Sequence, residues 1–245
     1  MNTPTAKITH LFHSGYAVET AEHFLIFDYY QPAPGKKNGI AEGIITSDYL
    51  QTKKNVFVFV SHSHADHFDP KIVDWAKSNP AITYIVSSDV QISAAHLHCH
   101  VLSAYEEANV NQLAIKTFGS TDQGLSFSLQ VDGLSIFHAG DLNWWHWTGE
   151  SLTEQAAAEL AFKTEIDKLR LQVNHIDIAF FPIDRRMEKF YSIGAEYFAD
   201  QLKPTLLVPM HFGKDFAATK LFAAKAKELS IHTVEVTHPG QEIFF

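Results

Sequence analysis

Four side chains of types that commonly bind metal ions are clustered in the segment SHSHADH, residues 61–67. They are His62, His64, Asp66 and His67. The spacing differs from the HExxH pattern, in which two histidines lie one turn apart on a helix. On an extended backbone His62 and His64 point the same way, whereas Asp66 and His67 turn away from them and can serve a second ion. Imidazole and carboxylate ligands suit Zn²⁺, Mn²⁺ and Fe²⁺, so the segment predicts a site for one or two divalent ions.

Rigid elements are expected on both sides of this segment. Residues 56–60, VFVFV, are apolar on both faces, which is typical of a strand buried on both sides. Asp69 and Pro70 have the types preferred at a helix N-cap and first turn, so we expect a helix from Pro70 to Lys77. A loop held between a buried strand and a helix can keep metal ligands in a fixed geometry.

Further candidate ligands follow other predicted strands. Asp28 comes after LIF, Asp141 after SIFHAG, and His211 after LLVPM. Taken singly, an aspartate in a turn or a histidine buried in a core would explain each of them. Together with residues 62–67 they predict two imidazole sites and a carboxylate able to bridge them.

The composition describes an ordinary globular protein of 245 residues, with 46% hydrophobic and 19% charged residues. Its 19 basic and 28 acidic residues give a net charge of −9 without a basic stripe, so we expect a small-molecule substrate rather than nucleic acid. The single Cys99 excludes a disulfide framework, and no apolar run predicts a signal peptide or a membrane span. We expect a cytoplasmic protein with one domain over residues 1–245, and leave a homo-oligomer open.

The order of elements predicts an α+β fold. Helical periodicity and caps predict helices over residues 151–173, 193–202 and 215–229, and a short helical stretch over 90–95. We expect strands over residues 8–12, 16–19, 23–27, 56–60, 82–86, 113–118, 125–131, 134–138, 176–182, 205–209, 233–236 and 241–244. His96, His98 and His100 alternate around Cys99, and we interpret them as a solvated strand edge rather than a metal site. Two mixed β-sheets packed face to face with helices outside, an αββα four-layer sandwich, fit this order best.

These motifs resemble the metallo-β-lactamase fold superfamily of metallo-hydrolases. The resemblance rests on HSHADH at residues 62–67, HAGD ending at Asp141 and VPMHFG around His211, and it covers essentially the whole chain. The stretches FHAGD, FFPI and VPMHFG look most like the branch that contains ascorbate-6-phosphate lactonase.

The resemblance assigns a role to each candidate ligand. It implies that His62 and His64 hold a first metal ion, that Asp66, His67 and His211 hold a second, and that Asp141 bridges the two. It gives Asp66 and Asp141 catalytic roles, and Asp28 the role of orienting a ligand from behind.

One position departs from the family pattern. The superfamily has another histidine for the first metal before the Asp141 strand, and the matching stretch here, residues 117–124, contains none. Asp122, His138 or water would then complete the first metal site.

The predicted reaction is hydrolysis of a small ester, lactone or phosphodiester by metal-activated water. A metal-binding domain with weak or no catalysis and a ribonuclease-type phosphodiesterase remain the alternatives. Residues that follow the ligands along the chain could line the substrate pocket, namely Asn143, Trp144, His146, Asp184 and Arg185.

Overall fold

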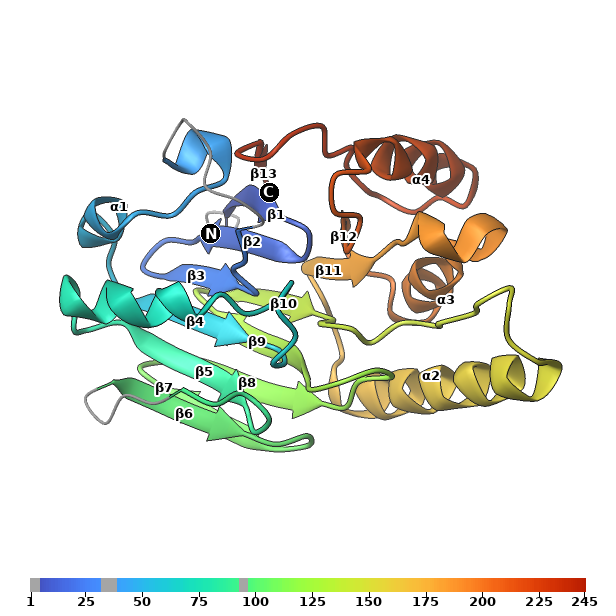
Figure 1. Cartoon of the computed structure of the whole chain (residues 1–245), viewed down its shortest axis with the longest axis horizontal. Helices are drawn as coiled ribbons and strands as arrows, with labels where there is room; N and C mark the ends of the chain where they lie inside the picture. The colour runs from blue at the N-terminus through green and yellow to red at the C-terminus, as the bar shows by residue number, and fades with distance from the viewer. Residues whose placement is uncertain (1–4, 32–38, 93–96) are drawn as a thin grey trace.

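The computed structural model describes residues 5–31, 39–92 and 97–245, and within them the chain forms two mixed β-sheets (Figure 1). The first sheet has seven strands in the order β13 (Glu242–Phe244), β1 (Lys7–Phe12), β2 (Gly15–Glu19), β3 (Phe24–Phe27), β4 (Val56–Val60), β5 (Thr83–Ser87) and β6 (His98–Leu102). The second has six in the order β12 (Leu206–Met210), β11 (Ile178–Pro182), β10 (Leu134–His138), β9 (Ser126–Val131), β8 (Leu113–Phe118) and β7 (Glu107–Val110).

Each sheet is antiparallel in one half and parallel in the other. In the first sheet β13, β1, β2 and β3 pair antiparallel, and β3 to β6 pair parallel. In the second sheet β10, β11 and β12 pair parallel, and β7 to β10 pair antiparallel. Parallel strands carry their carboxyl ends to one edge, so the loops after β3, β4, β10, β11 and β12 can meet there.

Helices cover the two outer faces. On the first sheet lie α1 (Ser47–Gln51) and the 3₁₀ helix η2 (Pro70–Lys77), whose Leu50, Ile72 and Trp75 pack with the strand residues of that face. On the second sheet lie α2 (Leu152–Gln172), α3 (Ile193–Leu202) and α4 (Phe216–Glu228), as Figure 1 shows. Two further 3₁₀ turns are η1 (Ile40–Glu42) and η3 (Arg185–Phe190). The arrangement confirms the predicted α+β fold with helices outside two face-to-face sheets.

Aromatic side chains fill the space between the sheets. The rings of Phe27 and Phe59 stack with centroids 4.9 Å apart, and Phe59 meets Phe127 of the second sheet edge-on at 5.4 Å. The alternate residues Val58 and Val60 face the other side of β4, where α1 and η2 pack. β4, the strand before residues 61–67, is therefore buried on both faces, as its composition predicts.

Some predicted elements differ from the structure. The strand expected over residues 233–236 is reduced to one bridge between Thr233 and Leu207, because the chain turns away after it. Part of the helical stretch expected over residues 90–95 lies outside the described residues, as does His96. His98 and His100 are exposed on β6, the edge strand, which agrees with a solvated edge. None of the described helices is both long and apolar enough to cross a membrane.

Candidate metal centre

The candidate ligands meet at one edge of the molecule, in the turns that follow strands. His13 follows β1, Asp28 follows β3, residues 61–67 follow β4, and His211 follows β12. Three of these residues have left-handed backbones, with φ of 55° at His13, 42° at Asp28 and 65° at His211. Such conformations cost about 1–3 kcal/mol each for residues other than glycine, and they concentrate at functional sites. The surrounding sheets therefore hold these turns in place against local strain.

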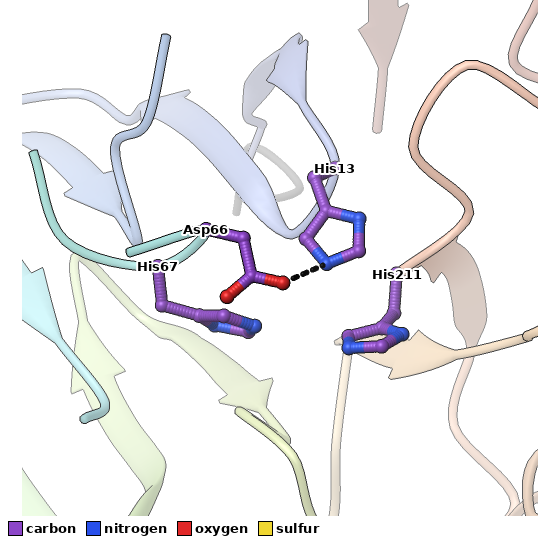
Figure 2. A group of neighbouring side chains, drawn as sticks. All are labelled: His13, Asp66, His67 and His211. Atoms are coloured by element: carbon purple, nitrogen blue, oxygen red, sulfur yellow. Dashed lines mark ion pairs between the residues drawn. The ribbon is translucent and has the colours of Figure 1, made fainter. Parts of the chain in front are cut away.

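The ligand-type atoms form two groups, each with members within 4.8 Å of one another. His62, His64 and Asp141 form the first group. The second group contains His13, Asp66, His67 and His211, which turn their side chains toward one another in Figure 2.

Asp141 lies between the two groups. Its Oδ2 is 3.3 Å from His62 Nε2, and its Oδ1 is 3.1 Å from His67 Nε2 and 3.4 Å from His211 Nε2. The carboxylate is 3% exposed. Burial raises its pKa, but the imidazoles of His67, His62 and His211 outweigh this and hold it well below its usual value. Asp141 is therefore an anion in contact with both groups, as a bridging ligand would be.

Asp28 orients one histidine of each group. Its Oδ2 accepts from His67 Nδ1 at 2.7 Å and from the Ser61 hydroxyl at 2.6 Å, and its Oδ1 accepts from the Ser61 backbone N–H at 2.7 Å. The Ser61 hydroxyl oxygen in turn lies 2.9 Å from His62 Nδ1. Because Nδ1 of both imidazoles is used in this way, their Nε2 atoms present lone pairs toward Asp141. The Nε2 of His62 also lies 3.0 Å from His64 Nδ1.

Asp184 orients His211 in the way that Asp28 orients His67. Its Oδ2 accepts from His211 Nδ1 at 3.1 Å, and it also binds the guanidinium of Arg186. Burial raises the pKa of Asp184, yet the hydrogen bonds from His211 and Arg186 lower it to about 2. The sequence placed Asp184 in the substrate pocket, whereas the structure places it behind His211.

The contact between His67 and Asp141 requires a cation between the two side chains. Its Nε2 and Asp141 Oδ1 lie 3.1 Å apart, both are buried, and neither has a hydrogen-bond partner among the described residues. With Nδ1 donating to Asp28, two lone-pair atoms face each other, which is stable only with a proton or a metal ion between them. Burial lowers the pKa of His67, but the carboxylates of Asp141 and Asp28 raise it to about 10. These donor atoms therefore fit a divalent metal ion, which would replace that proton.

His13 was not predicted from the sequence as part of the site. Its Nε2 lies 3.3 Å from Asp66 Oδ2, and its ring centroid lies 4.2 Å from that of His211. Burial lowers the pKa of His13 to about 4, although Asp66 acts against it. The signal was present, because His13 directly follows the predicted strand over residues 8–12, as the other candidates follow theirs.

The two residues considered for the incomplete first group lie outside both groups. His138 Nε2 lies 3.0 Å from the Ser14 carbonyl oxygen, and its Nδ1 accepts from the Gly140 N–H at 3.2 Å. Both ring nitrogens are thus occupied, and the ring stacks on Phe27 between the sheets at 4.9 Å. Asp122 is exposed and lines the cavity beside the groups.

The loop before β9 does approach the first group. At Gly124, φ is 76°, and a Cβ there would come within 2.4 Å of the His62 Cβ, so only glycine allows this close approach. The Thr121 hydroxyl donates to the Asn143 carbonyl at 2.6 Å and accepts from the Asn143 N–H at 2.9 Å. This clamp joins the loop to the turn that carries Asp141.

A cavity of 540 Å³ opens over both groups. Its lining combines His64, Asp66, Asp141 and His211 with Trp145 and Trp147, Arg186, and the acidic Asp122, Glu150 and Glu154. The indole rings of Trp145 and Trp147 are nearly parallel, with centroids 5.8 Å apart.

The residues predicted to line the pocket lie beside this cavity rather than in its lining. Trp144 packs on Phe162 of α2 and His146 on Phe190, so alternate residues of this extended segment, Trp145 and Trp147, face the cavity. Asn143 is 1% exposed behind the Asp141 turn. Arg185 pairs with Asp215 at 3.2 Å, and the adjacent Arg186 lines the cavity, where Arg185 was expected.

Comparison with known proteins finds relatives that share the fold. The sequence matches the family described as "Beta-lactamase superfamily domain" over residues 7–211. A UPF0173 metal-dependent hydrolase of Bacillus velezensis is 26% identical over 227 residues, which cover 84% of this chain and 85% of the relative. The UPF0173 metal-dependent hydrolase YtkL of Bacillus subtilis is 24% identical, with the same coverage of both chains.

Two solved structures share the fold. Igni18, a metallo hydrolase from the archaeon Ignicoccus hospitalis, superimposes with a TM-score of 0.67 at 20% identity, covering 98% of both chains. CmlA, a diiron β-hydroxylase from Streptomyces venezuelae, gives 0.66 at 11% identity, covering all of this chain and 54% of that one. At these identities the two structures show the fold alone.

Proposed function

The chain belongs to the beta-lactamase superfamily, and from this membership we propose that it hydrolyses a small ester, lactone or phosphodiester with the help of one or two divalent metal ions. The observation that carries the proposal is the contact of one buried carboxylate, Asp141, with histidines of both groups. Since Cys99 is the single cysteine, we also propose a reducing, cytoplasmic location.

We assign the ligands by group. His62 and His64 would hold one ion, His67, His211 and Asp66 the other, and Asp141 would touch both. The donors are nitrogen and oxygen atoms without thiolates, which Zn²⁺, Mn²⁺ and Fe²⁺ all accept. When bound, such ions act as Lewis acids and make water nucleophilic at neutral pH.

The chain's own residues would orient the site. Asp28 and Asp184 hold His67 and His211 in the tautomer that presents Nε2 to the centre. Asp66 has its side chain 49% exposed and lines the cavity, and His13 holds its pKa well below the usual value. Its ionised carboxylate would therefore orient a water molecule in the cavity by accepting a hydrogen bond from it. Asp141 stays ionised and opposes the positive charge at the centre.

The charges in the cavity favour an uncharged substrate. Asp122, Glu150 and Glu154 line the cavity, and the Arg186 guanidinium is already bound by Asp184. A phosphodiester would meet these carboxylates, whereas a lactone or ester would meet mainly the indole faces of Trp145 and Trp147. Because FHAGD and VPMHFG resemble the lactonase branch, we propose a lactone as the first substrate to test.

The experiment combines metal analysis with a substrate panel. Protein purified without chelator should contain one to two metal ions per chain, and should hydrolyse a lactone or an ester faster than bis(4-nitrophenyl) phosphate. Asp141→Asn is the inactive comparison. Stoichiometric metal with no turnover on any member of the panel would favour the alternative, a metal-binding domain without catalysis. Preferred cleavage of RNA would favour the ribonuclease reading.

A further inference from the structure

The hydrogen bonds around His13 determine which of its ring nitrogens carries a proton. The backbone N–H of Gly213 donates to His13 Nδ1 at 3.1 Å, so Nδ1 must present a lone pair. The proton of the neutral ring is then on Nε2, the atom that faces Asp66 and the rest of the second group. A protonated nitrogen has no lone pair for a metal ion.

This arrangement is opposite to that of the other two imidazoles in the group. His67 and His211 use Nδ1 toward the carboxylates of Asp28 and Asp184, which leaves a lone pair on Nε2. His13 lies among the same ligand atoms but presents a donor. Proximity alone therefore does not make His13 a ligand.

The His13 donor needs an acceptor. Its Nε2 is buried and has no hydrogen bond among the described residues, although Asp66 Oδ2 is only 3.3 Å away (Figure 2). Asp66 is half exposed, so a small rotation of its side chain can bring this oxygen into line. A buried donor without an acceptor is unfavourable, which favours that rotation.

His138 shows the same pattern with its partner in place. The Gly140 N–H donates to its Nδ1, and its Nε2 lies 3.0 Å from the Ser14 carbonyl oxygen. Two histidines with a backbone N–H on Nδ1 thus differ in what their Nε2 faces: a carbonyl for His138, and the Asp66 carboxylate for His13.

We propose that His13 is a positioning residue that donates its Nε2–H to Asp66 Oδ2 and leaves Asp66 Oδ1 for the metal ion, rather than a metal ligand itself. His13 would then orient Asp66 through a hydrogen bond, as Asp28 orients His67 and Asp184 orients His211. The proposal deepens the proposed function and rests on its metal centre.

The tautomer can be read directly. In protein labelled with ¹⁵N-histidine, the signals of His13 are those missing from the spectrum of the His13→Gln variant. We expect a protonated Nε2 and an unprotonated Nδ1, both in the metal-free protein and after saturation with Zn²⁺. A proton on Nδ1, or an Nε2 that loses its proton on Zn²⁺ addition, overturns the proposal.

Zn²⁺ titration tests whether His13 acts through Asp66. His13→Gln should bind the same number of Zn²⁺ ions as the wild type, with affinity lowered about 10–100-fold. In an Asp66→Ala background the same change should have no further effect beyond about twofold, because the residue it positions is gone. His10→Gln removes a buried imidazole on β1 that belongs to neither group, and should leave the affinity within about twofold of the wild type.

The outcomes separate this proposal from the function on which it rests. Loss of a bound Zn²⁺ ion in His13→Gln, or additive weakening in the double variant, makes His13 a ligand and overturns the proposal alone. A wild type that binds no Zn²⁺, Mn²⁺ or Fe²⁺ removes the proposed function together with it. A metal-binding wild type without turnover leaves both tests of His13 decisive, since neither requires a substrate.

Discussion

Asp28 Oδ2 lies 2.7 Å from His67 Nδ1, and this contact decides which nitrogen of His67 faces the metal centre. The same carboxylate reaches His62 through the Ser61 hydroxyl, so one buried aspartate orients a histidine of each group. Burial raises the pKa of Asp28, but the imidazoles of His67, His138 and His62 lower it overall. The residue therefore acts as an anion at the base of the whole site.

Asp28→Asn is expected to weaken metal binding about 10–100-fold, because the amide no longer stabilises the His67 tautomer with a free Nε2. Competition with a chelator measures the affinity for Zn²⁺. Circular dichroism should show a folded protein, since asparagine has nearly the same volume and tolerates the left-handed backbone at this position. An unchanged affinity would reduce Asp28 to a turn residue at the end of β3.

Asp141→Ala is expected to abolish hydrolysis while the protein stays folded. The residue lies in a turn after β10 and contributes contacts to His62, His67 and His211 rather than to the apolar core. Turnover and a thermal melt of the metal-free protein are the two measurements. Loss of the cooperative melt in the absence of metal would show that Asp141 has a structural role instead.

Removing the metal should lower stability as well as activity. A ligand at 100 times its Kd stabilises the folded state by about 2.7 kcal/mol, so chelation should lower the melting temperature by several degrees. His67→Ala should show a smaller difference between its melting temperatures with and without chelator than the wild type, because the second group has lost a ligand while His62, His64 and Asp141 of the first group remain. A variant at a distant exposed histidine, His232→Ala, should keep the wild-type difference.

The acid sensitivity of the fold should depend on His10. Burial lowers the pKa of His10 from 6.5 to about 4, with the His238 carbonyl acting against it. The unfolded chain therefore binds a proton that the folded chain rejects between these pH values. The free energy of unfolding should fall as the pH drops from 6.5 to 4, by about 3 kcal/mol for this one group.

Replacing the imidazole tests that dependence. His10→Phe keeps a ring between Tyr16 and Phe212, with which the histidine ring now packs. In denaturant melts of the metal-free protein, the free energy of unfolding of the variant should depend less steeply on pH than that of the wild type. The expected difference in slope is ~1.4 kcal/mol per pH unit, which corresponds to one proton. Equal slopes for variant and wild type would show that His10 does not control the acid transition.

The sequence was sufficient to predict most of the fold and the clustering of most of the candidate ligands, because both follow local patterns. The run over residues 56–60 is apolar at every position, and the ligand types come directly after strands. His13 was missed because it stands alone in the sequence. Only the strand order β1-β2-β3-β4 of the first sheet brings the turn after β1 close to the loop after β4, which carries Asp66. His138 looked like a ligand because it precedes Asp141, but the pleat of β10 turns its ring between the sheets.

Pocket residues were harder to predict than ligands. In an extended segment alternate side chains point to opposite sides, so either Trp144 or Trp145 could face the cavity. The sequence does not distinguish the two, because both residues are tryptophan and no alternation of polar and apolar residues marks the buried side. The same uncertainty affects the loop before β9. Which of its residues replaces the expected histidine depends on the turn at Gly124, where the chain passes close to His62.

Asp122→His is expected to tighten Zn²⁺ binding by the first group about tenfold, because Zn²⁺ favours four ligands and this group contains only His62, His64 and Asp141 among the described residues. Asp122 lines the cavity together with His64 and Asp141, so an imidazole there can turn toward them. Ser120→His, two residues earlier on the same loop, is the matched variant within the stretch 117–124, where the family resemblance leads us to expect a histidine. It should leave the affinity unchanged, since Ser120 does not belong to the cavity lining. Calorimetric titration with Zn²⁺ distinguishes the two, and tighter binding by Ser120→His alone would mean that the loop turns inward at Ser120 instead.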